Sequence, residues 1–169
     1  MFELYWYQSE AIQALFDFFQ DPTKFLDEDF EGSPHLANPV LALPTGSGKS
    51  IVIAEFCKIV LTHWPDQRIM MLTHVKELIE QNAKKLWAQW PEAPLGIFSA
   101  GLKSKQAFPP IVFGGVQSVA RAIQKDKFAF GSRDLIIIDE AHLLSPKDTS
   151  QYQTVIKTLK SVNPYLDVS

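Results

Sequence analysis

The sequence predicts an α/β fold in which helices cover both faces of a doubly wound, mainly parallel sheet. Short apolar runs alternate along the chain with longer segments whose apolar residues recur every three or four positions, which is typical of alternating strands and helices. Such alternation favours a parallel sheet. Residues 135–138 are apolar throughout, as expected of a strand covered on both faces. The chain has 169 residues, and we expect 1–169 to form a single domain.

Each element has its own signal. Apolar residues at helical spacing predict a first helix over 8–20, which the Asp21-Pro22 pair ends. Residues 21–39 are acidic and contain several Pro and Gly residues, and they predict a surface loop. Apolar runs predict strands at 40–43, 68–73, 95–99, 110–113 and 134–139, and helical spacing predicts a helix that ends near 62 and further helices at 75–90, 118–124 and 152–160.

Composition and charge narrow the class of protein. The net charge of −3 and the pI of about 5.8 do not require a nucleic-acid partner, so such a partner would bind a local surface. The lone cysteine, Cys57, cannot form an internal disulfide, and a buried thiol in a reducing compartment is expected. No apolar run reaches the roughly 18–20 residues that span a bilayer, and the first residues lack a basic secretory region. These features predict a cytoplasmic protein without membrane contact.

A glycine-containing loop joins the apolar run at 40–43 to the next helix. Its residues are Thr45, Gly46, Ser47, Gly48, Lys49 and Ser50. The glycines allow backbone conformations and close approaches that a side chain would block, so that loop N–H groups and the helix N-terminus can face phosphate oxygens. Lys49 would neutralise the β- and γ-phosphates, and Ser50 would hold Mg²⁺. The full motif starts with another glycine where this chain has Leu43, and a plain glycine-rich turn is the alternative.

Two acids follow the apolar run at 134–138. Because ligands of open α/β folds bind at the carboxyl edge of the sheet, Asp139 and Glu140 are expected to lie at that edge. Asp139 would hold Mg²⁺, and Glu140 would orient and deprotonate the attacking water. The alternative for an Asp-Glu pair in this position is a solvated strand end or a helix cap.

The loop at 45–50 together with Asp139-Glu140-Ala141-His142 resembles the DEAD/DEAH-box helicases and translocases of superfamily 2. The chain is most similar to the branch that includes the helicase subunits of type III restriction enzymes and the bacterial RadD-type repair helicases. The resemblance implies a RecA-like P-loop NTPase lobe that uses ATP and Mg²⁺. It also implies catalytic roles for Lys49, Asp139, Glu140 and His142, with His142 coupling the nucleotide state to nucleic-acid binding.

Three further segments fit this resemblance. Residues 7–12 resemble the adenine-reading motif of the family, in which the amide of Gln8 would donate to and accept from the base. Tyr5 stands where the family often has Arg, and it would stack on the base. Residues 72–78 and 114–118 resemble two motifs that contact the nucleic-acid backbone. The contacts implied there are Thr73, His74, Lys76, Gln117 and Ser118, and capping of the strand ends is the alternative for both segments.

The resemblance covers nearly the whole chain but only the first of the two lobes of the family, and it ends before motif III. We therefore expect the ATP-binding first lobe of an ATP-dependent helicase or translocase, with DNA favoured over RNA. The missing lobe carries an arginine finger, which contributes about 10³–10⁵ in rate in related enzymes. Little hydrolysis or unwinding is expected from this chain alone, and a protein partner would supply the second lobe.

Two other functions stay open at this point. The first is a non-catalytic one-lobe module that binds a partner protein or nucleic acid as a decoy or regulator. The second is a small P-loop kinase that transfers phosphate to a metabolite, although Asp-Glu-Ala-His is unusual in kinases and no acceptor-site motif is visible. Binding of Mg-ATP separates the helicase lobe from the decoy, and phosphate transfer would identify the kinase.

Overall fold

The computed structural model describes residues 3–21, 40–43, 48–140 and 145–169 of the chain. The strands are β1 (Ile69–Thr73), β2 (Leu95–Ser99), β3 (Ser104–Lys105), β4 (Ile111–Gly115), β5 (Leu135–Ile138) and β6 (Asp167–Val168). The helices are α1 (Trp6–Gln20), α2 (Lys49–His63), α3 (Lys76–Gln89), α4 (Val116–Lys125) and α5 (Pro146–Val162). These strands form one sheet in the order β3-β2-β4-β1-β5-β6.

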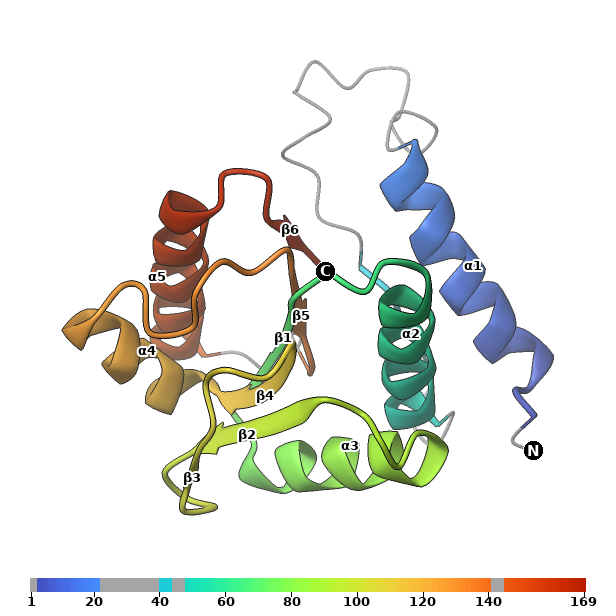
Figure 1. Ribbon diagram of the computed structural model, residues 1–169, viewed down its shortest axis with the longest axis horizontal. Coiled ribbons are helices and arrows are strands. Elements are labelled where there is room, and N and C mark those ends of the chain that lie inside the picture. The colour runs from blue at the N-terminus through green and yellow to red at the C-terminus, as the bar shows by residue number, and fades with distance from the viewer. Residues whose placement is uncertain (1–2, 22–39, 44–47, 141–144) are drawn as a thin grey trace.

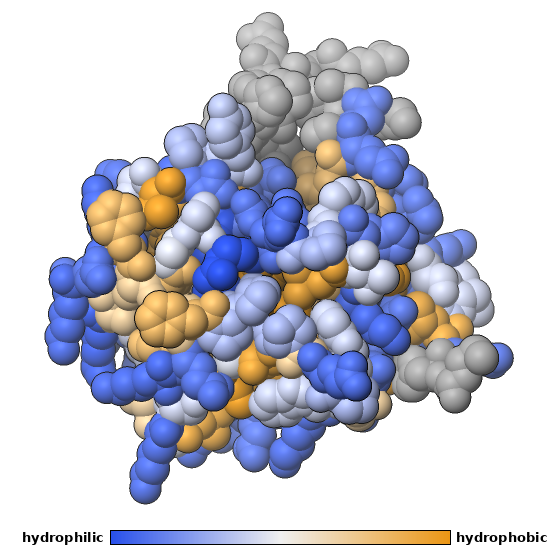
Figure 2. All heavy atoms as spheres, in the orientation of Figure 1, coloured by the Kyte–Doolittle hydropathy of each residue, from blue (hydrophilic) through white to orange (hydrophobic). Residues whose placement is uncertain are grey.

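The sheet is parallel except for β3, which pairs with β2 in the antiparallel direction. Helices α1, α2 and α3 lie on one side of the sheet, and α4 and α5 lie on the other (Figure 1). This arrangement confirms the doubly wound α/β fold. Hydrophilic side chains make up most of the molecular face seen in Figure 2. In the described part of the chain, no helix has the length and apolar character needed to cross a membrane.

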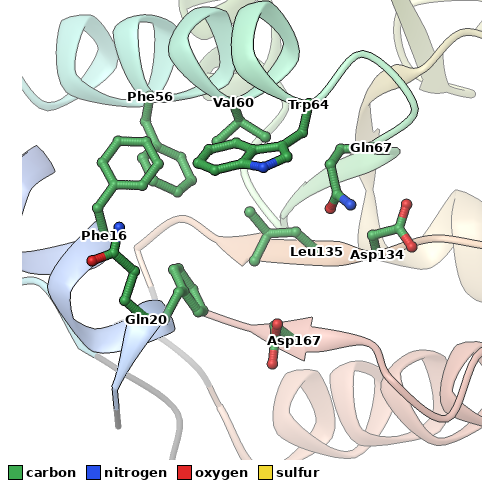
Figure 3. Close-up of a pocket in the computed structure, with 10 residues that line it drawn as sticks. Phe16, Gln20, Phe56, Val60, Trp64, Gln67, Asp134, Leu135 and Asp167 are labelled. Carbon is green, nitrogen blue, oxygen red and sulfur yellow. The ribbon is translucent and has the colours of Figure 1, made fainter.

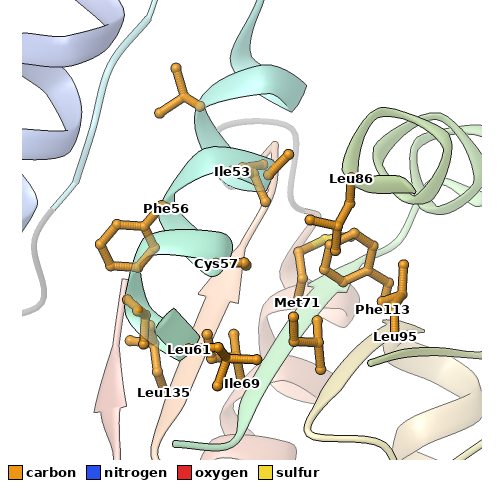
Figure 4. Close-up of a cluster of buried hydrophobic side chains, with 14 of the residues drawn as sticks. Ile53, Phe56, Cys57, Leu61, Ile69, Met71, Leu86, Leu95, Phe113 and Leu135 are labelled. Carbon is orange, nitrogen blue, oxygen red and sulfur yellow. The ribbon is translucent and has the colours of Figure 1, made fainter. Parts of the chain in front are cut away.

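Alternation along the central strand β1 builds two separate cores, because successive side chains of a strand point to opposite faces. Ile69 and Met71 belong to the core under α1, α2 and α3. Met70 and Leu72 belong to the core under α4 and α5. Figure 4 shows the first core, in which Met71 and Phe113 face the helices α2 and α3. Burial on both faces explains why this strand lacks a polar alternation in the sequence.

A fully buried arginine holds the amino ends of three central strands together. Arg133 precedes β5 and is 0% exposed. Its guanidinium donates over 2.7–3.3 Å to the backbone carbonyl oxygens of Ile69, Ala107, Pro109, Pro110 and Phe130. Burial lowers the pKa of Arg133 to about 9, and the charge of Arg68 acts in the same direction. The side chain is therefore charged at neutral pH, and its partners are neutral oxygens.

One predicted strand is wrong. Residues 40–43 form no strand in the structure. They line a cavity of about 460 Å³ whose other walls include Ile137 of β5 and Val168 of β6. A strand forms by backbone hydrogen bonds with a neighbouring strand. On the other side of this cavity, β6 is only two residues long. In the described residues the sheet therefore ends at β6, and residues 40–43 are not part of it.

The other elements fall close to their predicted ranges, with three differences. The two-residue strands β3 and β6 were not predicted, because so short a segment shows no apolar pattern. Helix α5 begins at Pro146 instead of 152 because Ser145 caps it. Ser145 Oγ accepts from the N–H of Asp148 over 3.2 Å, and the Asp148 carboxylate accepts from the N–H of Ser145. Of the predicted surface loop 21–39, residues 22–39 lie outside the described residues.

Candidate nucleotide site

Helix α2 begins directly after Gly48, which has a φ of +76°. A Cβ atom at this position would lie 2.6 Å from Nε2 of Gln8. Glycine is therefore required both by the left-handed backbone and by the close approach of α1. The free N–H groups and positive dipole end of α2 face this point, as anion binding requires. Thr45, Gly46 and Ser47 lie outside the described residues.

Lys49 meets both acids of the second motif. Its Nζ lies 2.7 Å from Oδ1 of Asp139 and also contacts Oε1 of Glu140. The side chain of Asp139 is 1% exposed, whereas that of Lys49 is 31% exposed. The three groups line the cavity of about 460 Å³ beside β5. The structure thus brings together the residues that the two motifs predicted, although Lys49 and Glu140 are 91 positions apart in the sequence.

The charges in this cluster determine the protonation state of Lys49. Burial alone would lower the pKa of the ammonium, but hydrogen bonds to Asp139 and Glu140 and their negative charges outweigh it. The pKa of Lys49 is therefore raised above its ordinary value of 10.5. One positive charge faces two negative charges, so the cluster keeps an excess negative charge that favours a further cation.

Glu140 has an unusual backbone. Its φ is +57°, in the left-handed region that non-glycine residues rarely adopt. This conformation costs roughly 1–2 kcal/mol for a residue with a side chain. Strained backbone of this kind concentrates at functional positions. Ala141 and His142, which complete the acidic motif, lie outside the described residues.

Asn82 of α3 is a member of this site that the sequence analysis missed. Its Nδ2 donates to Oδ2 of Asp139 over 2.9 Å, and the residue is 1% exposed. In the sequence Asn82 falls on the apolar face of the predicted helix 75–90. That position predicts burial in the core and gives no sign of a role in the site. The signal that could have found it is a polar residue between Ile79 and Leu86 on that apolar face.

The two predicted adenine contacts lie near the start of α1. Gln8 is 1% exposed and lies against Gly48, and its Oε1 accepts from the N–H of Tyr5 over 2.9 Å. Tyr5 is 67% exposed, and its ring stacks on Tyr7 with 5.7 Å between ring centroids. Gln8 is thus beside the phosphate loop, and Tyr5 is accessible to a ligand. Their contacts with adenine stay predictions. Ser50, the second residue of α2, is buried.

Two predicted nucleic-acid contacts have capping roles in the structure. Thr73 is 0% exposed, and its Oγ1 accepts from the N–H of Val75 over 3.2 Å. Ser118 Oγ accepts from the N–H of Ala100 over 3.0 Å. Both hydroxyls therefore stabilise turns at the carboxyl ends of strands. Capping is the alternative that the sequence analysis left open for these segments, and contact of Thr73 and Ser118 with nucleic acid stays a prediction.

The other three predicted nucleic-acid contacts lie at the same edge of the sheet. His74 follows β1 and is partly buried, and its Nδ1 has no hydrogen-bond partner among the described residues. Lys76 is exposed at the first turn of α3, and Gln117 is exposed at the first turn of α4. Their positions fit a surface beside the nucleotide site, and their contact with nucleic acid stays a prediction.

A second cavity lies at the opposite end of the strands. Its volume is about 230 Å³, and Figure 3 shows the aromatic rings of Phe16, Phe56 and Trp64 on one side of it. Asp134 and Asp167, at the amino ends of β5 and β6, line the other side. Asp134 already accepts from the backbone N–H of Arg68 and the side chain of Asn163. This cavity is therefore mainly an aromatic space between α1 and α2.

The fold and the cluster at Lys49 define the class of protein: the N-terminal, RecA-like lobe of a superfamily 2 helicase. The family model described as Type III restriction enzyme, res subunit matches residues 1–166. The chain therefore belongs to this family, whose members are helicases and ATPases that use ATP with Mg²⁺. A comparison with curated proteins finds no match.

Solved structures with a similar fold agree with this class. The UvsW helicase from bacteriophage T4 matches with a TM-score of 0.64 and 20% identity, over 99% of this chain and 51% of that chain. A second structure of T4 UvsW matches with a TM-score of 0.65 and 21% identity, over 99% and 29% of the two chains. A nuclease-deletion mutant of the Type ISP restriction-modification enzyme LlaGI, in complex with a DNA substrate mimic, matches with a TM-score of 0.60 and 15% identity, over 99% and 17%. This chain thus spans about half or less of the structures that it matches.

Proposed function

We propose that this chain binds Mg-ATP as the first lobe of an ATP-dependent DNA helicase or translocase. The observation that carries the proposal is the convergence of Lys49, Asp139 and Glu140 at the N-terminus of α2. A cation, two carboxylates and a helix N-terminus at the carboxyl edge of a parallel sheet are the groups that phosphoryl chemistry needs. The family to which the chain belongs supports the same assignment.

The residues present fit ATP and Mg²⁺. Gly48 has no side chain where a phosphate would approach, and a Cβ there would already crowd Gln8. Mg²⁺ prefers oxygen ligands. The Ser50 hydroxyl, directly after Lys49 in the sequence, and the Asp139 carboxylate, 2.7 Å from Nζ of Lys49, would supply such oxygens. Asp139 and Ser50 would hold the metal ion, which would supply positive charge to offset the charge of the phosphates.

Each residue of the cluster has a role that follows from its charge. In the structure, the ammonium of Lys49 contacts both Asp139 and Glu140 and offsets part of their negative charge. With nucleotide, the same ammonium pairs with phosphate oxygens, and Asp139 is free to hold a metal ion. Glu140 then orients a water molecule at its carboxylate and accepts the proton of that water. Gln8 and Tyr5 would recognise adenine beside Gly48.

The nucleic-acid surface is proposed at the carboxyl ends of β1 and β4. His74, Lys76 and Gln117 lie there, and side chains of these types bind phosphates without reading bases. DNA is favoured over RNA, in keeping with the family of restriction-enzyme subunits and with the DNA substrate mimic bound by LlaGI. Residues 1–169 match one lobe, so these residues by themselves should hydrolyse ATP slowly if, as in related enzymes, catalysis needs the arginine finger of a second lobe.

Calorimetric titration of Mg-ATP tests the proposal. The wild-type chain is expected to bind, and Lys49→Ala should lose about tenfold or more in affinity, because a charge-assisted contact is worth roughly 1.5–3 kcal/mol. Lys84→Ala is the matched control. Lys84 is exposed on α3 and pairs only loosely with Glu80, at 3.4 Å, so its removal makes the same charge change away from the site. A wild-type chain that binds no nucleotide would contradict the proposal.

A further inference from the structure

Asn82 contacts the acidic edge of the site although it is neither acid nor base. It donates from Nδ2 to Oδ2 of Asp139 over 2.9 Å. The other oxygen of that carboxylate, Oδ1, lies 2.7 Å from Nζ of Lys49. The two oxygens of Asp139 therefore have different partners, an amide on one side and a cation on the other.

The surroundings fix which way the Asn82 amide points. Its Nδ2 also lies 3.9 Å from Sδ of Met71, which is a weak acceptor. If the amide were turned over, its carbonyl oxygen would face a carboxylate and a thioether, neither of which can donate a hydrogen bond. The amide must therefore present its donor to Asp139.

The buried face of α3 does not need an amide for packing. The neighbours of Asn82 on that face are Ile79, Ala83 and Leu86. The Oδ1 atom of Asn82 is buried and has no hydrogen-bond partner among the described residues, and a buried acceptor in that state lowers stability. An apolar side chain would fill this position without that loss. A polar group kept at a cost to the fold is expected where the site needs it.

We propose that Asn82 is a positioning residue for magnesium. By holding Oδ2 of Asp139, it keeps Oδ1 directed toward the space that Nζ of Lys49 reaches, so that this oxygen is ready to bind the metal of Mg-ATP. Asn82 acts through Asp139 and does not contact the metal. The inference rests on the proposed function, because it requires a nucleotide-bound Mg²⁺ at Asp139.

The test measures nucleotide affinity with and without magnesium. A fluorescent ATP analogue is titrated with the wild-type chain and with Asn82→Leu and Asn82→Ala, once in Mg²⁺ and once in EDTA. Both variants should lose roughly 10–100-fold in affinity in Mg²⁺, the usual loss when a group that orients a metal ligand is removed. Their affinity in EDTA should hardly change, because Lys49 and the loop still bind phosphate. The EDTA titration also shows that the variants are folded.

Two controls separate positioning from general damage to the fold. Gln81→Ala changes an exposed neighbour on the same helix, and it should leave both affinities as in the wild type. Asp139→Ala removes the carboxylate itself. If Asn82 acts through Asp139, adding Asn82→Leu to Asp139→Ala should cause no further loss in Mg²⁺, because the two changes are not additive.

The possible outcomes are distinct. If the wild-type chain binds no nucleotide, the proposed function fails and this inference fails with it. If Mg²⁺ raises the nucleotide affinity of the wild-type chain and of Asn82→Leu by the same factor, only the inference fails. An equal loss in Mg²⁺ and in EDTA, or a further loss on the Asp139→Ala background, would also overturn the inference.

Discussion

Two cations lie inside this fold at opposite ends of β5, and their partners differ. Arg133, before the strand, is 0% exposed, and its acceptors in the described part of the chain are backbone carbonyl oxygens. Lys49 meets the other end of the strand, where its partners are the carboxylates of Asp139 and Glu140. Its side chain is 31% exposed. One cation is thus enclosed by neutral backbone, and the other is open to solvent and faces charge.

The difference separates a structural cation from a functional one. One acceptor of Arg133 is the carbonyl oxygen of Ile69 in β1, and the others belong to the segments that precede β4 and β5, so these partners cannot move without moving the backbone. Carboxylates can exchange one cation for another, and under the proposed function Lys49 would pair with a phosphate instead. A buried cation whose partners are backbone atoms contributes to stability. A partly exposed cation whose partners are exchangeable carboxylates is suited to binding.

The largest expected effect is on stability. Arg133→Met should lower the free energy of unfolding by about 3–5 kcal/mol, because several buried carbonyl oxygens lose their donor at roughly 1–3 kcal/mol each. Urea unfolding followed by circular dichroism measures this loss. Arg121→Met, on the exposed face of α4, is the control and should stay within about 0.5 kcal/mol of the wild type. Equal losses in both variants would remove the structural role of Arg133.

The contrast predicts a smaller loss of stability at Lys49. Lys49→Met should lower the free energy of unfolding by about 1–2 kcal/mol, because water can still solvate part of the cluster and a hydrogen bond to a charged group is worth about that much. The same variant should lose nucleotide binding. A stability loss as large as that of Arg133→Met would mean that Lys49 is a structural cation too.

The pH dependence of the Lys49 pair is the next smaller effect. Because the pKa of Lys49 is raised in the folded state, its contribution to stability is complete below the unfolded value of 10.5 and disappears as pH rises through the higher folded value. The difference in unfolding free energy between wild type and Lys49→Met should therefore be constant from about pH 8 to pH 10 and then shrink. A difference that grows with pH in this range would contradict the sign of the shift.

The smallest expected effect concerns Cys57, whose thiol should not react in the native state. The thiol is fully buried on α2, and burial raises its pKa to about 12. Ellman's reagent at about pH 8 should modify it only through unfolding, so the rate should rise in urea. Rapid labelling of the native chain would show that α2, which carries Lys49, opens far more easily than the core around Arg133.

The fold class followed from the sequence because periodicity reports burial directly. In the predicted strands 68–73 and 134–139, residues 69–72 and 135–138 are apolar without alternation, and the structure buries the sheet on both faces. Periodicity does not show whether an apolar run has a neighbouring strand with which it can form backbone hydrogen bonds. For that reason residues 40–43 read as a strand but form none in the described structure.

The candidate site was predictable where chemistry is encoded in adjacent residues. Lys49 sits in a glycine loop, and Asp139 and Glu140 are consecutive after a strand. Asn82 and Arg133 gave no comparable signal. Asn82 acts across the fold on Asp139, 57 positions away, and Arg133 bonds to backbone atoms of distant segments, one of them 64 positions away. Contacts of that kind exist only after the strands have assembled.

The left-handed backbone of Glu140 also limits which amino acids can occupy this position. Glycine, and to a smaller degree asparagine and aspartate, adopt a φ near +57° at less cost than glutamate does. If position 140 were randomised and variants were selected for folding alone, those three residues should be enriched over glutamate. Selection for the proposed ATP-dependent function should restore glutamate. Comparing the two selections would separate what this residue does for the chain from what it does for its chemistry.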